Sequence, residues 1–344
     1  MRIWLDALTA KQARLMGHLA RKAEAWGHEV LLTVRDYDFA PSIARRIGMR
    51  HTVVGTYGGE TLEGKLAADI NRMEGLLKLV AEFKPDVLVS YPSPSAVRVA
   101  YGLGIRIIVY SDSPHSVHPH RLTVPLADYL VHSALIPRSW YDPYITPWTR
   151  IVTFRGVEEY EWIQGYDCKR TTRLTIEEPF IVYRPPEYKA SYYKAEGYSL
   201  FLGIVEEALR RGYRIIVMPR YPDQYEALKK RYGSDRRVQI VYREAVETLD
   251  LYCSASGVIT GGATMAREAA LMCKPAISLY PTFINSVLEA LGLPIRQLGP
   301  NVEPREVIDT LEKIEEKCPR DVINAFEPPS SALRRVLAQL EERS

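Results

Sequence analysis

The sequence predicts an α/β protein built from two doubly wound, Rossmann-like domains. The chain has 344 residues, which is long for a single core. Short apolar runs alternate with amphipathic runs of helical length, and this alternation occurs in each half of the chain. Strands separated by such helices form a parallel sheet with helices on both faces. We expect domains at 1–165 and 176–326, and a last helix within 327–344 that crosses back to the first domain.

Each half is read from its apolar periodicity. The first half is predicted to hold strands at 3–7, 29–34, 86–91, 106–110, 129–133 and 150–154, and helices at 11–26, 63–83 and 94–102. The second half is predicted to hold strands at 180–184, 214–218, 238–242, 257–260 and 276–280, and helices at 198–211, 222–232, 244–253 and after Gly262. The polar segment 155–179 is interpreted as the linker.

A local echo links the two halves. "AEAWGHEVLLTVR" ends at Arg35 and "ALRRGYRIIVMPR" ends at Arg220, each eight residues after a glycine, Gly27 or Gly212. The echo suggests a duplicated architecture. The alternative is that helix, glycine cap and strand follow one another in any sheet of this kind.

Composition and charge exclude some classes of protein. With 45 Lys plus Arg against 42 Asp plus Glu, the net charge of +3 gives no basis for a nucleic-acid-binding surface. The start "MRIWLDA" reads as a strand without signal-peptide features, and no apolar run has membrane-spanning length, so we expect a cytoplasmic protein. Peripheral membrane contact and the oligomeric state stay open. No CxxC spacing occurs, so neither a zinc site nor disulfides are predicted for Cys168, Cys253, Cys273 and Cys318.

The stretch "TGGATMAREAALMCKP" suggests an anion site. Gly261 and Gly262 follow the apolar run 257–260 and precede a helix that begins near Thr264 and Met265. Backbone N–H groups at such a corner, together with the helix start, favour a phosphate. Glu268, one to two turns along, is predicted to accept hydrogen bonds from ribose hydroxyls. The alternative is a turn kept for tight packing, with Glu268 solvated.

Two arginines are predicted to assist at the same edge. Arg184 is the last residue of the predicted strand 180–184, and Arg220 comes just after the predicted strand 214–218. A guanidinium at such a strand end can grip diphosphate oxygens in a fork. The alternative for both is surface ion pairing.

This region resembles known nucleotide-sugar enzymes. Glu268, followed seven residues later by Pro275 within "YREAVETLDLYCSASGVITGGATMAREAALMCKPAISLYP", is similar to the donor region of GT-B glycosyltransferases of the MurG kind and of UDP-N-acetylglucosamine 2-epimerases. The resemblance implies that Glu268 binds the ribose and the glycine turn binds the diphosphate. It also implies that the loop from Tyr242 and Arg243 to Ala245 meets the base.

A resemblance over almost the whole chain identifies it as a member of the GT-B-like family catalogued as domain of unknown function 354. The matching segments are "DALTAKQARLMGHLARKAEAWGHEVLLTVRDYD", "SYPSPSAVRVAYGLGI", "YSDSPHSVHPHRLTVPLAD", "RGVEEYEWI", "VYRPPEYKASYY", "MPRYPDQ" and "GGATMAREAALMCKP". However, "DALTAKQ" lacks the glycine-rich turn of MurG-like enzymes, and no His-Glu-Ala-Gly-x-Arg segment follows 106–110. Acceptor and catalytic residues therefore do not carry over from either relative.

First-domain candidates are read from their chemistry. Asp112 and His115 follow a strand end in "YSDSPHSVHPH", so the histidine can serve as a base oriented by the carboxylate. The alternative is an Asp-Ser-Pro turn in which the aspartate caps the backbone. The spacing of His115, His118 and His120 is also compatible with a metal site. However, no cysteine or second cluster accompanies these histidines, so no metal is predicted.

Two further groups lie near predicted strand ends. Asp6, Thr9 and Lys11 lie at the end of the first strand and form a second cluster, with capping or solvation as the alternative. Glu158 and Glu159 lie in the predicted linker, where one could close over a sugar; the alternative is a pair of surface carboxylates.

The predicted function is metal-independent sugar transfer from a UDP-type nucleotide sugar bound in the cleft between the domains. No cofactor is expected beyond this substrate. The alternatives are a 2-epimerase or hydrolase that uses the same donor site, and a non-catalytic nucleotide-sugar sensor.

Overall fold

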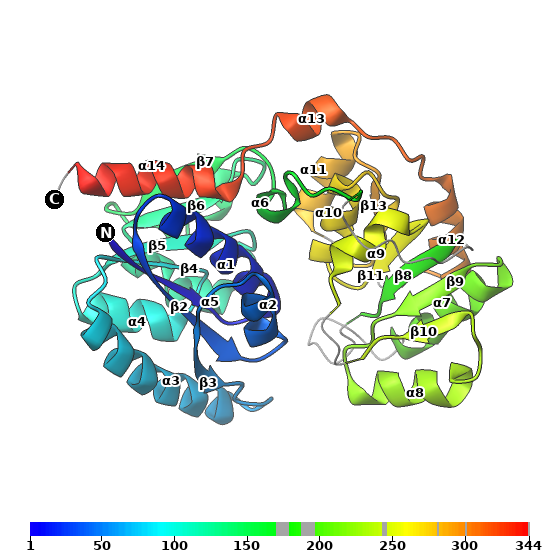
Figure 1. Cartoon of the computed structure of the whole chain (residues 1–344), viewed down its shortest axis with the longest axis horizontal. Helices are drawn as coiled ribbons and strands as arrows, with labels where there is room; N and C mark the ends of the chain where they lie inside the picture. Colours follow the sequence, from blue (N-terminus) through cyan, green and yellow to red (C-terminus); the bar gives the residue numbers. More distant parts are fainter. Residues whose placement is uncertain (170–178, 187–196, 243–245, 281, 300, 343–344) are drawn as a thin grey trace. The chain divides into compact units, whose positions relative to one another are not determined.

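The chain folds into two compact units, as seen in a computed structural model that describes residues 1–169, 179–186, 197–242, 246–280, 282–299 and 301–342. Unit 1 comprises Met1–Gln164 and Ala325–Ser344, and unit 2 comprises Gly165–Asn324 (Figure 1). Both contain a parallel sheet with helices, so the predicted fold class of two Rossmann-like domains is confirmed. The expectation that the whole of 155–179 is a linker is wrong, because residues 155–164 belong to unit 1.

Unit 1 is built on a seven-stranded parallel sheet in the order β3-β2-β1-β4-β5-β6-β7. The strands are β1 (Arg2–Ala7), β2 (Glu29–Asp36), β3 (Thr52–Thr56), β4 (Val87–Ser90), β5 (Arg106–Ser111), β6 (Tyr129–Ser133) and β7 (Arg150–Phe154). The helices are α1 (Ala10–Ala25), α2 (Ala40–Arg46), α3 (Leu62–Phe83), α4 (Pro94–Gly102), α5 (Val117–Arg121), α6 (Tyr160–Ile163) and α14 (Pro329–Glu341), and the 3-10 helices are η1 (Val124–Leu126) and η2 (Arg138–Trp140).

Helices cover both faces of this sheet. α1 contacts α2, α6 and α14, whereas α3 contacts α4 on the other side. The central strand β1 is buried from Ile3 to Ala7, as expected for a parallel strand between two helical layers. The sequence patterns did not indicate α2 and β3, because both are short and Gly55 interrupts the apolar run of β3.

The C-terminal helix α14 packs within unit 1, where it lies beside β7 in red (Figure 1). The Tyr110 hydroxyl of β5 donates to the Pro329 carbonyl at 3.1 Å, and the Glu161 carboxylate accepts from the Ser330 amide at 2.8 Å. Burial raises the pKa of Glu161 above its ordinary value. The chain therefore leaves unit 1 after Gln164 and returns to it at Ala325.

Unit 2 has a six-stranded parallel sheet in the order β10-β9-β8-β11-β12-β13. The strands are β8 (Phe180–Arg184), β9 (Arg214–Val217), β10 (Val238–Ile240), β11 (Gly257–Thr260), β12 (Ala276–Ser278) and β13 (Ile295–Gln297). The helices are α7 (Gly197–Arg210), α8 (Pro222–Tyr232), α9 (Thr248–Ser254), α10 (Thr264–Leu271), α11 (Phe283–Ala290), α12 (Pro304–Lys313) and α13 (Arg320–Asn324).

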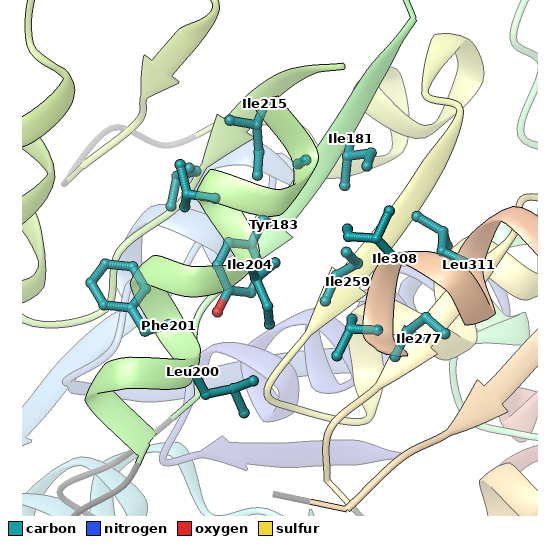
Figure 2. Packing of buried hydrophobic residues seen from close by; sticks show 14 of the residues in the cluster. Ile181, Tyr183, Leu200, Phe201, Ile204, Ile215, Ile259, Ile277, Ile308 and Leu311 are labelled. Atoms are coloured by element: carbon teal, nitrogen blue, oxygen red, sulfur yellow. The ribbon is translucent and has the colours of Figure 1, made fainter. Parts of the chain in front are cut away.

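The core of unit 2 follows the two-residue period of its strands. Ile181 and Tyr183 of β8 point to one face with Ile215 of β9, and they pack against α7 (Figure 2). α8 and α12 add residues to the same cluster, including Ile308 and Leu311 of α12. Because β8 is buried on both faces, the alternation decides which face of the sheet each of its side chains enters.

Two disulfides tie the segments near the crossings between the units to the body of unit 2. Cys168 is bonded to Cys253 at the end of α9, and Cys273 is bonded to Cys318 beyond α12. The expectation of four reduced cysteines is therefore wrong. The spacing along the sequence carried no signal, because the partners lie 85 and 45 residues apart and only the fold brings them together.

We predict that reduction of the disulfides destabilises unit 2. Cross-links that close loops of 85 and 45 residues each restrict the unfolded chain, worth about 4 kcal/mol in the chain-entropy treatment. Adding a reductant should lower the melting temperature by about 10 °C or more. The measurement is a calorimetric scan with and without reductant. A Cys253→Ser/Cys273→Ser variant is the control and should not respond; an unchanged wild-type melting temperature would contradict the prediction.

Candidate functional site

Each sheet has one point at which the strand order reverses direction. In unit 1 this point lies between β1 and β4, and in unit 2 it lies between β8 and β11. Ligands of open parallel sheets bind beyond the carboxyl ends of the strands at such a reversal. The residues that follow β1, β4, β8 and β11 are therefore the first candidates in each unit.

A buried ion pair supports the reversal point of unit 1. Asp6 at the end of β1 is fully buried, and its Oδ1 lies 2.6 Å from Arg72 Nη2 of α3. Thr33 of β2 donates to Asp6 Oδ1 at 2.5 Å, and Ser93 after β4 donates to Oδ2 at 2.8 Å. Both carboxylate oxygens are thus satisfied inside the protein. Asp6 therefore has a structural role, and we do not retain it as a candidate base.

Gly55 makes room for the Arg72 side chain. Arg72 Nε donates to the Val54 carbonyl at 3.0 Å, and Nη1 donates to Ser95 Oγ at 3.1 Å. A Cβ atom on Gly55 would lie 2.9 Å from Arg72 Cγ, and the glycine has a φ of +76°. Only a residue without a side chain allows this passage.

We predict that Asp6→Asn destabilises the protein by about 3–5 kcal/mol. The substitution keeps the side-chain volume but leaves the Arg72 charge buried without its counterion. Urea denaturation followed by circular dichroism measures the loss. Asp36→Asn, at the exposed end of β2, is the matched control and should change stability by less than about 0.5 kcal/mol. Equal stabilities for the two variants would contradict the assignment.

A charged cluster lies beyond the ends of β1, β4, β5 and β7. Lys11, in the first turn of α1, has its Nζ in ion pairs with Asp112 after β5 and with Glu158 after β7, the latter at 2.6 Å. The Tyr91 hydroxyl, directly after β4, donates to the same Glu158 oxygen, and Lys11 Nζ lies 5.5 Å from the Tyr91 ring centre. One ammonium thus holds two carboxylates from separate strands.

The two carboxylates differ in exposure. The Glu158 side chain is 2% exposed, and its Oε1 has no hydrogen-bond partner in the described part of the chain. The Asp112 side chain is 12% exposed and accepts a hydrogen bond from Ser113 Oγ at 2.8 Å. Glu159 is fully buried. The alternative of surface carboxylates at Glu158 and Glu159 is therefore wrong. Asp112 is the carboxylate of the cluster that solvent reaches.

The neighbouring candidates have mixed outcomes. Thr9 is the N-cap of α1 and accepts from the Gln12 amide, in keeping with the capping alternative. His115 is exposed in the turn after Asp112, and its role as a base stays a prediction. His120 is buried, with Nε2 2.7 Å from Ser111 Oγ and Nδ1 2.7 Å from the Ser116 carbonyl. Burial lowers the pKa of His120.

The corner after β11 in unit 2 is shaped by close backbone contacts. A Cβ atom on Gly261 would lie 2.1 Å from Pro186 Cα, so this position excludes any larger residue. The Gly262 amide donates to Thr260 Oγ1 at 3.0 Å. A Cβ atom on Gly262 would meet Arg220 Nη2 at 3.9 Å, which places the guanidinium beside the turn. Gly261 thus serves packing, whereas Gly262 faces a cation.

Helix α10 begins directly after this turn. Its N-cap, Ala263, supplies no side-chain hydrogen bond, so the first amides of the helix, near Thr264 and Met265, are not capped by that side chain. Glu268 lies on the same helix but is buried, and the Tyr252 hydroxyl donates to its Oε2 at 3.4 Å. The alternative of a solvated Glu268 is therefore wrong.

The remaining predicted donor residues lie at neighbouring strand ends. Arg184 ends β8, and its carbonyl accepts from the Gly261 amide at 2.8 Å. Tyr242, just after β10, stacks on Tyr225 of α8 with ring centres 4.7 Å apart. Arg243 lies outside the described residues. An aromatic pair thus stands at the edge where the base was predicted to bind.

Tyr91 and Arg72 were missed by sequence reasoning. Tyr91 is the last residue of the predicted strand 86–91, and this position was the available signal, since residues at the carboxyl ends of parallel strands meet at one sheet edge. Arg72 lies inside an amphipathic helix with no local pattern to distinguish it from a surface arginine. In the described part of the chain, no group of three or more His, Cys, Asp or Glu side chains is placed to hold a metal ion.

Comparisons with known proteins agree with this architecture. Residues 1–293 match the family described as "Protein of unknown function (DUF354)". The chain belongs to this family. This DUF354 protein is 28% identical, over 321 residues, to an uncharacterized protein of Methanocaldococcus jannaschii, and the match covers 90% of each chain.

Solved structures with the same fold include sugar-nucleotide enzymes and a glycosyltransferase. The UDP-GlcNAc 2-epimerase of M. jannaschii, crystallised with UDP-GlcNAc and UDP, aligns with a TM-score of 0.75 at 15% identity, over 98% of this chain and 100% of that chain. A spinosyn forosaminyltransferase aligns with a TM-score of 0.64 at 17% identity, over 99% of both chains. The predicted resemblance to GT-B-like proteins is confirmed for the DUF354 fold. No helix among its described residues is long and apolar enough to cross a membrane.

Proposed function

We propose that this DUF354 protein is an enzyme that binds a UDP-type nucleotide sugar through unit 2 and transfers the sugar to an acceptor hydroxyl. The observation that carries the proposal is the cluster at the strand-order reversal of unit 1, where Lys11 binds Asp112 and Glu158. A lysine in the first turn of a helix is disfavoured by the helix dipole, so the two carboxylates compensate for its placement. Such clusters of charged groups are typical of acid–base sites.

Unit 2 would bind the donor through its carboxyl edge. The Gly262 turn, the start of α10 and the Arg220 guanidinium can stabilise negative charge on a diphosphate, which is the leaving group in sugar transfer. Glu268 would accept hydrogen bonds from ribose hydroxyls, in exchange for its contact with Tyr252. The stacked Tyr225 and Tyr242 would give the base an aromatic surface.

Asp112 would activate the acceptor. Its partly exposed carboxylate takes the proton from the acceptor hydroxyl as that oxygen bonds to the anomeric carbon. The bond from this carbon to the diphosphate breaks at the same time, and its electron pair leaves with the diphosphate. Lys11 orients Asp112, and Glu158 with Tyr91 holds Lys11 in place.

For donor binding, we predict that Glu268→Gln lowers the affinity for UDP about ten- to a hundred-fold, since it removes charge-assisted hydrogen bonds to the ribose. Calorimetric titration measures this change. Glu226→Gln, on the exposed surface of α8, is the matched control and should bind UDP as the wild type does. Unchanged affinity in a folded Glu268→Gln protein would remove the ribose assignment.

For catalysis, we predict that Asp112→Asn lowers turnover by about 10²–10⁴, the usual contribution of a positioned base, and leaves UDP affinity unchanged. UDP release from UDP-sugars in the presence of acceptors measures turnover. Asp142→Asn, an exposed aspartate of the same unit, serves as the control. Full turnover in Asp112→Asn together with loss in His115→Ala would transfer the role of base to His115.

Epimerisation of the donor sugar is the second candidate function. The specific observation in its favour is that two carboxylates and Tyr91 meet at one ammonium, which provides more than one group able to accept or donate a proton. The two functions differ in their need for an acceptor. A changed sugar without any acceptor would indicate an epimerase, whereas UDP release that depends on an acceptor would indicate a transferase. UDP binding without either product would favour the sensor.

A further inference from the structure

An aromatic and cationic surface lies beside the unit 1 cluster, and the proton transfer and donor binding described above do not use it. Tyr37 after β2 and Tyr57 after β3 stack with ring centres 4.6 Å apart and an interplanar angle of 26°. Both rings are exposed, at 37% and 42%. The Arg35 guanidinium carbon lies 5.0 Å from the centre of one ring and 5.8 Å from the other. We call these three residues the Arg35 platform.

A bulge in β3 brings the two rings together. The parallel register pairs Val34 with Val53 but Asp36 with Thr56, so β3 contains one residue more than β2 at this point. Without the extra residue, Tyr37 would pair with Thr56, and Tyr57 would follow one step later. Bulges re-aim side chains and are frequent beside active sites. The same bulge contains Gly55, past which Arg72 reaches Asp6.

The platform is joined to the loop that leads to Lys11. Arg35 Nε donates to the Leu8 carbonyl at 3.2 Å, and Leu8 lies between β1 and α1. Because β3, β2 and β1 are adjacent, the platform stands about one to two strand spacings, roughly 5–10 Å, from the end of β1. Lys11, just beyond this loop, binds the partly exposed Asp112, and an acceptor anchored at the platform would extend past Lys11 toward that carboxylate.

The charge of Arg35 is only partly compensated. Among the described residues, no carboxylate lies within ion-pair distance of Arg35. Asp6 interacts with Arg35 electrostatically, but its carboxylate is already ion-paired with Arg72. Burial lowers the pKa of Arg35, and the positive charge of Arg72 lowers it further, while Tyr37, Asp6 and Tyr57 act in the opposite direction. A half-buried guanidinium between π faces is suited to gain an anion.

We propose that the Arg35 platform is the acceptor subsite and that it binds a pyranose ring carrying an anionic group, a carboxylate or a phosphate. The ring would stack on the exposed tyrosine faces, and the anion would bind the Arg35 fork. This inference rests on the proposed transferase function, since an epimerase needs no acceptor. Arg35 also occupies the position in unit 1 that corresponds in the sequence echo to Arg220, the predicted diphosphate partner in unit 2.

The test is direct binding of three probes to the whole protein without donor. Methyl glucuronide carries a carboxylate, glucose 1-phosphate carries a phosphate, and methyl glucoside is neutral. Titrations followed by saturation-transfer NMR should show that at least one anionic probe binds about tenfold or more tightly than the neutral probe. The better of the two anionic probes identifies the anion.

The variants are Arg35→Met, which removes the fork, and Tyr57→Ala, which removes one ring. Arg35→Met should abolish the preference for the anionic probe, and Tyr57→Ala should weaken all binding about two- to tenfold. Tyr101→Ala, an exposed tyrosine of α4, is the matched control and should bind as the wild type does. Arg35→Lys keeps the charge without the fork and covers the case in which Arg35→Met does not fold.

Three results would overturn the subsite: no binding of any probe, equal binding of the neutral and anionic probes, or binding that survives in both platform variants. UDP titration of the same samples separates this failure from a failure of the proposed function. If UDP binds and turns over but the probes do not depend on the platform, only the acceptor subsite fails. If the probes bind through the platform but no transfer occurs with any donor, the proposed function fails instead.

Discussion

The buried ion pair between Asp6 and Arg72 organises the carboxyl edge of the first sheet. Through it and its hydrogen-bond partners, one carboxylate and one guanidinium connect β1, β2, β3, α3 and the start of α4. Charges this deeply buried are tolerated only when their hydrogen-bonding capacity is filled, which constrains every contributing element. Gly55 is part of this constraint, because a side chain there would block Arg72. The loops that carry Lys11 and Tyr91 therefore start from a fixed edge.

The proposed function assigns different chemistry to the two units, and the assignment follows from their side chains. Unit 2 offers a glycine turn, a helix start and an arginine, which are features that bind anions without transferring protons. Unit 1 offers a lysine that bridges two carboxylates, which is a feature that can move a proton. This division is why donor affinity and turnover are expected to respond to different substitutions.

The bulge in β3 serves both the buried and the exposed parts of unit 1. On the inner side it lets Arg72 pass to Asp6, and on the outer side it pairs Tyr37 with Tyr57 beside Arg35. In unit 2, the two disulfides likewise connect a structural feature with a candidate site. They fasten the segments near both crossings to α9 and to the end of α10, and these helices carry Tyr252 and Glu268. The bulge in β3 and the two disulfides thus lie close to the candidate sites of their units.

The sequence by itself determined the two parallel sheets. The spacing of apolar residues differs between a strand and a helix, and this spacing can be read within each short segment because each element must bury its apolar side chains. It also placed Gly262, Arg220 and Asp112 at strand ends, where the topology of a parallel sheet leaves little choice. Only the tertiary structure decided which of the predicted groups are satisfied internally. Asp6 and Asp112 both lie at the carboxyl ends of apolar strands. However, Arg72 is ion-paired with Asp6 in the interior, whereas Lys11 binds Asp112 where solvent reaches it. The cysteine pairs and the stacked tyrosines depend equally on contacts between segments distant in sequence, which no local pattern encodes.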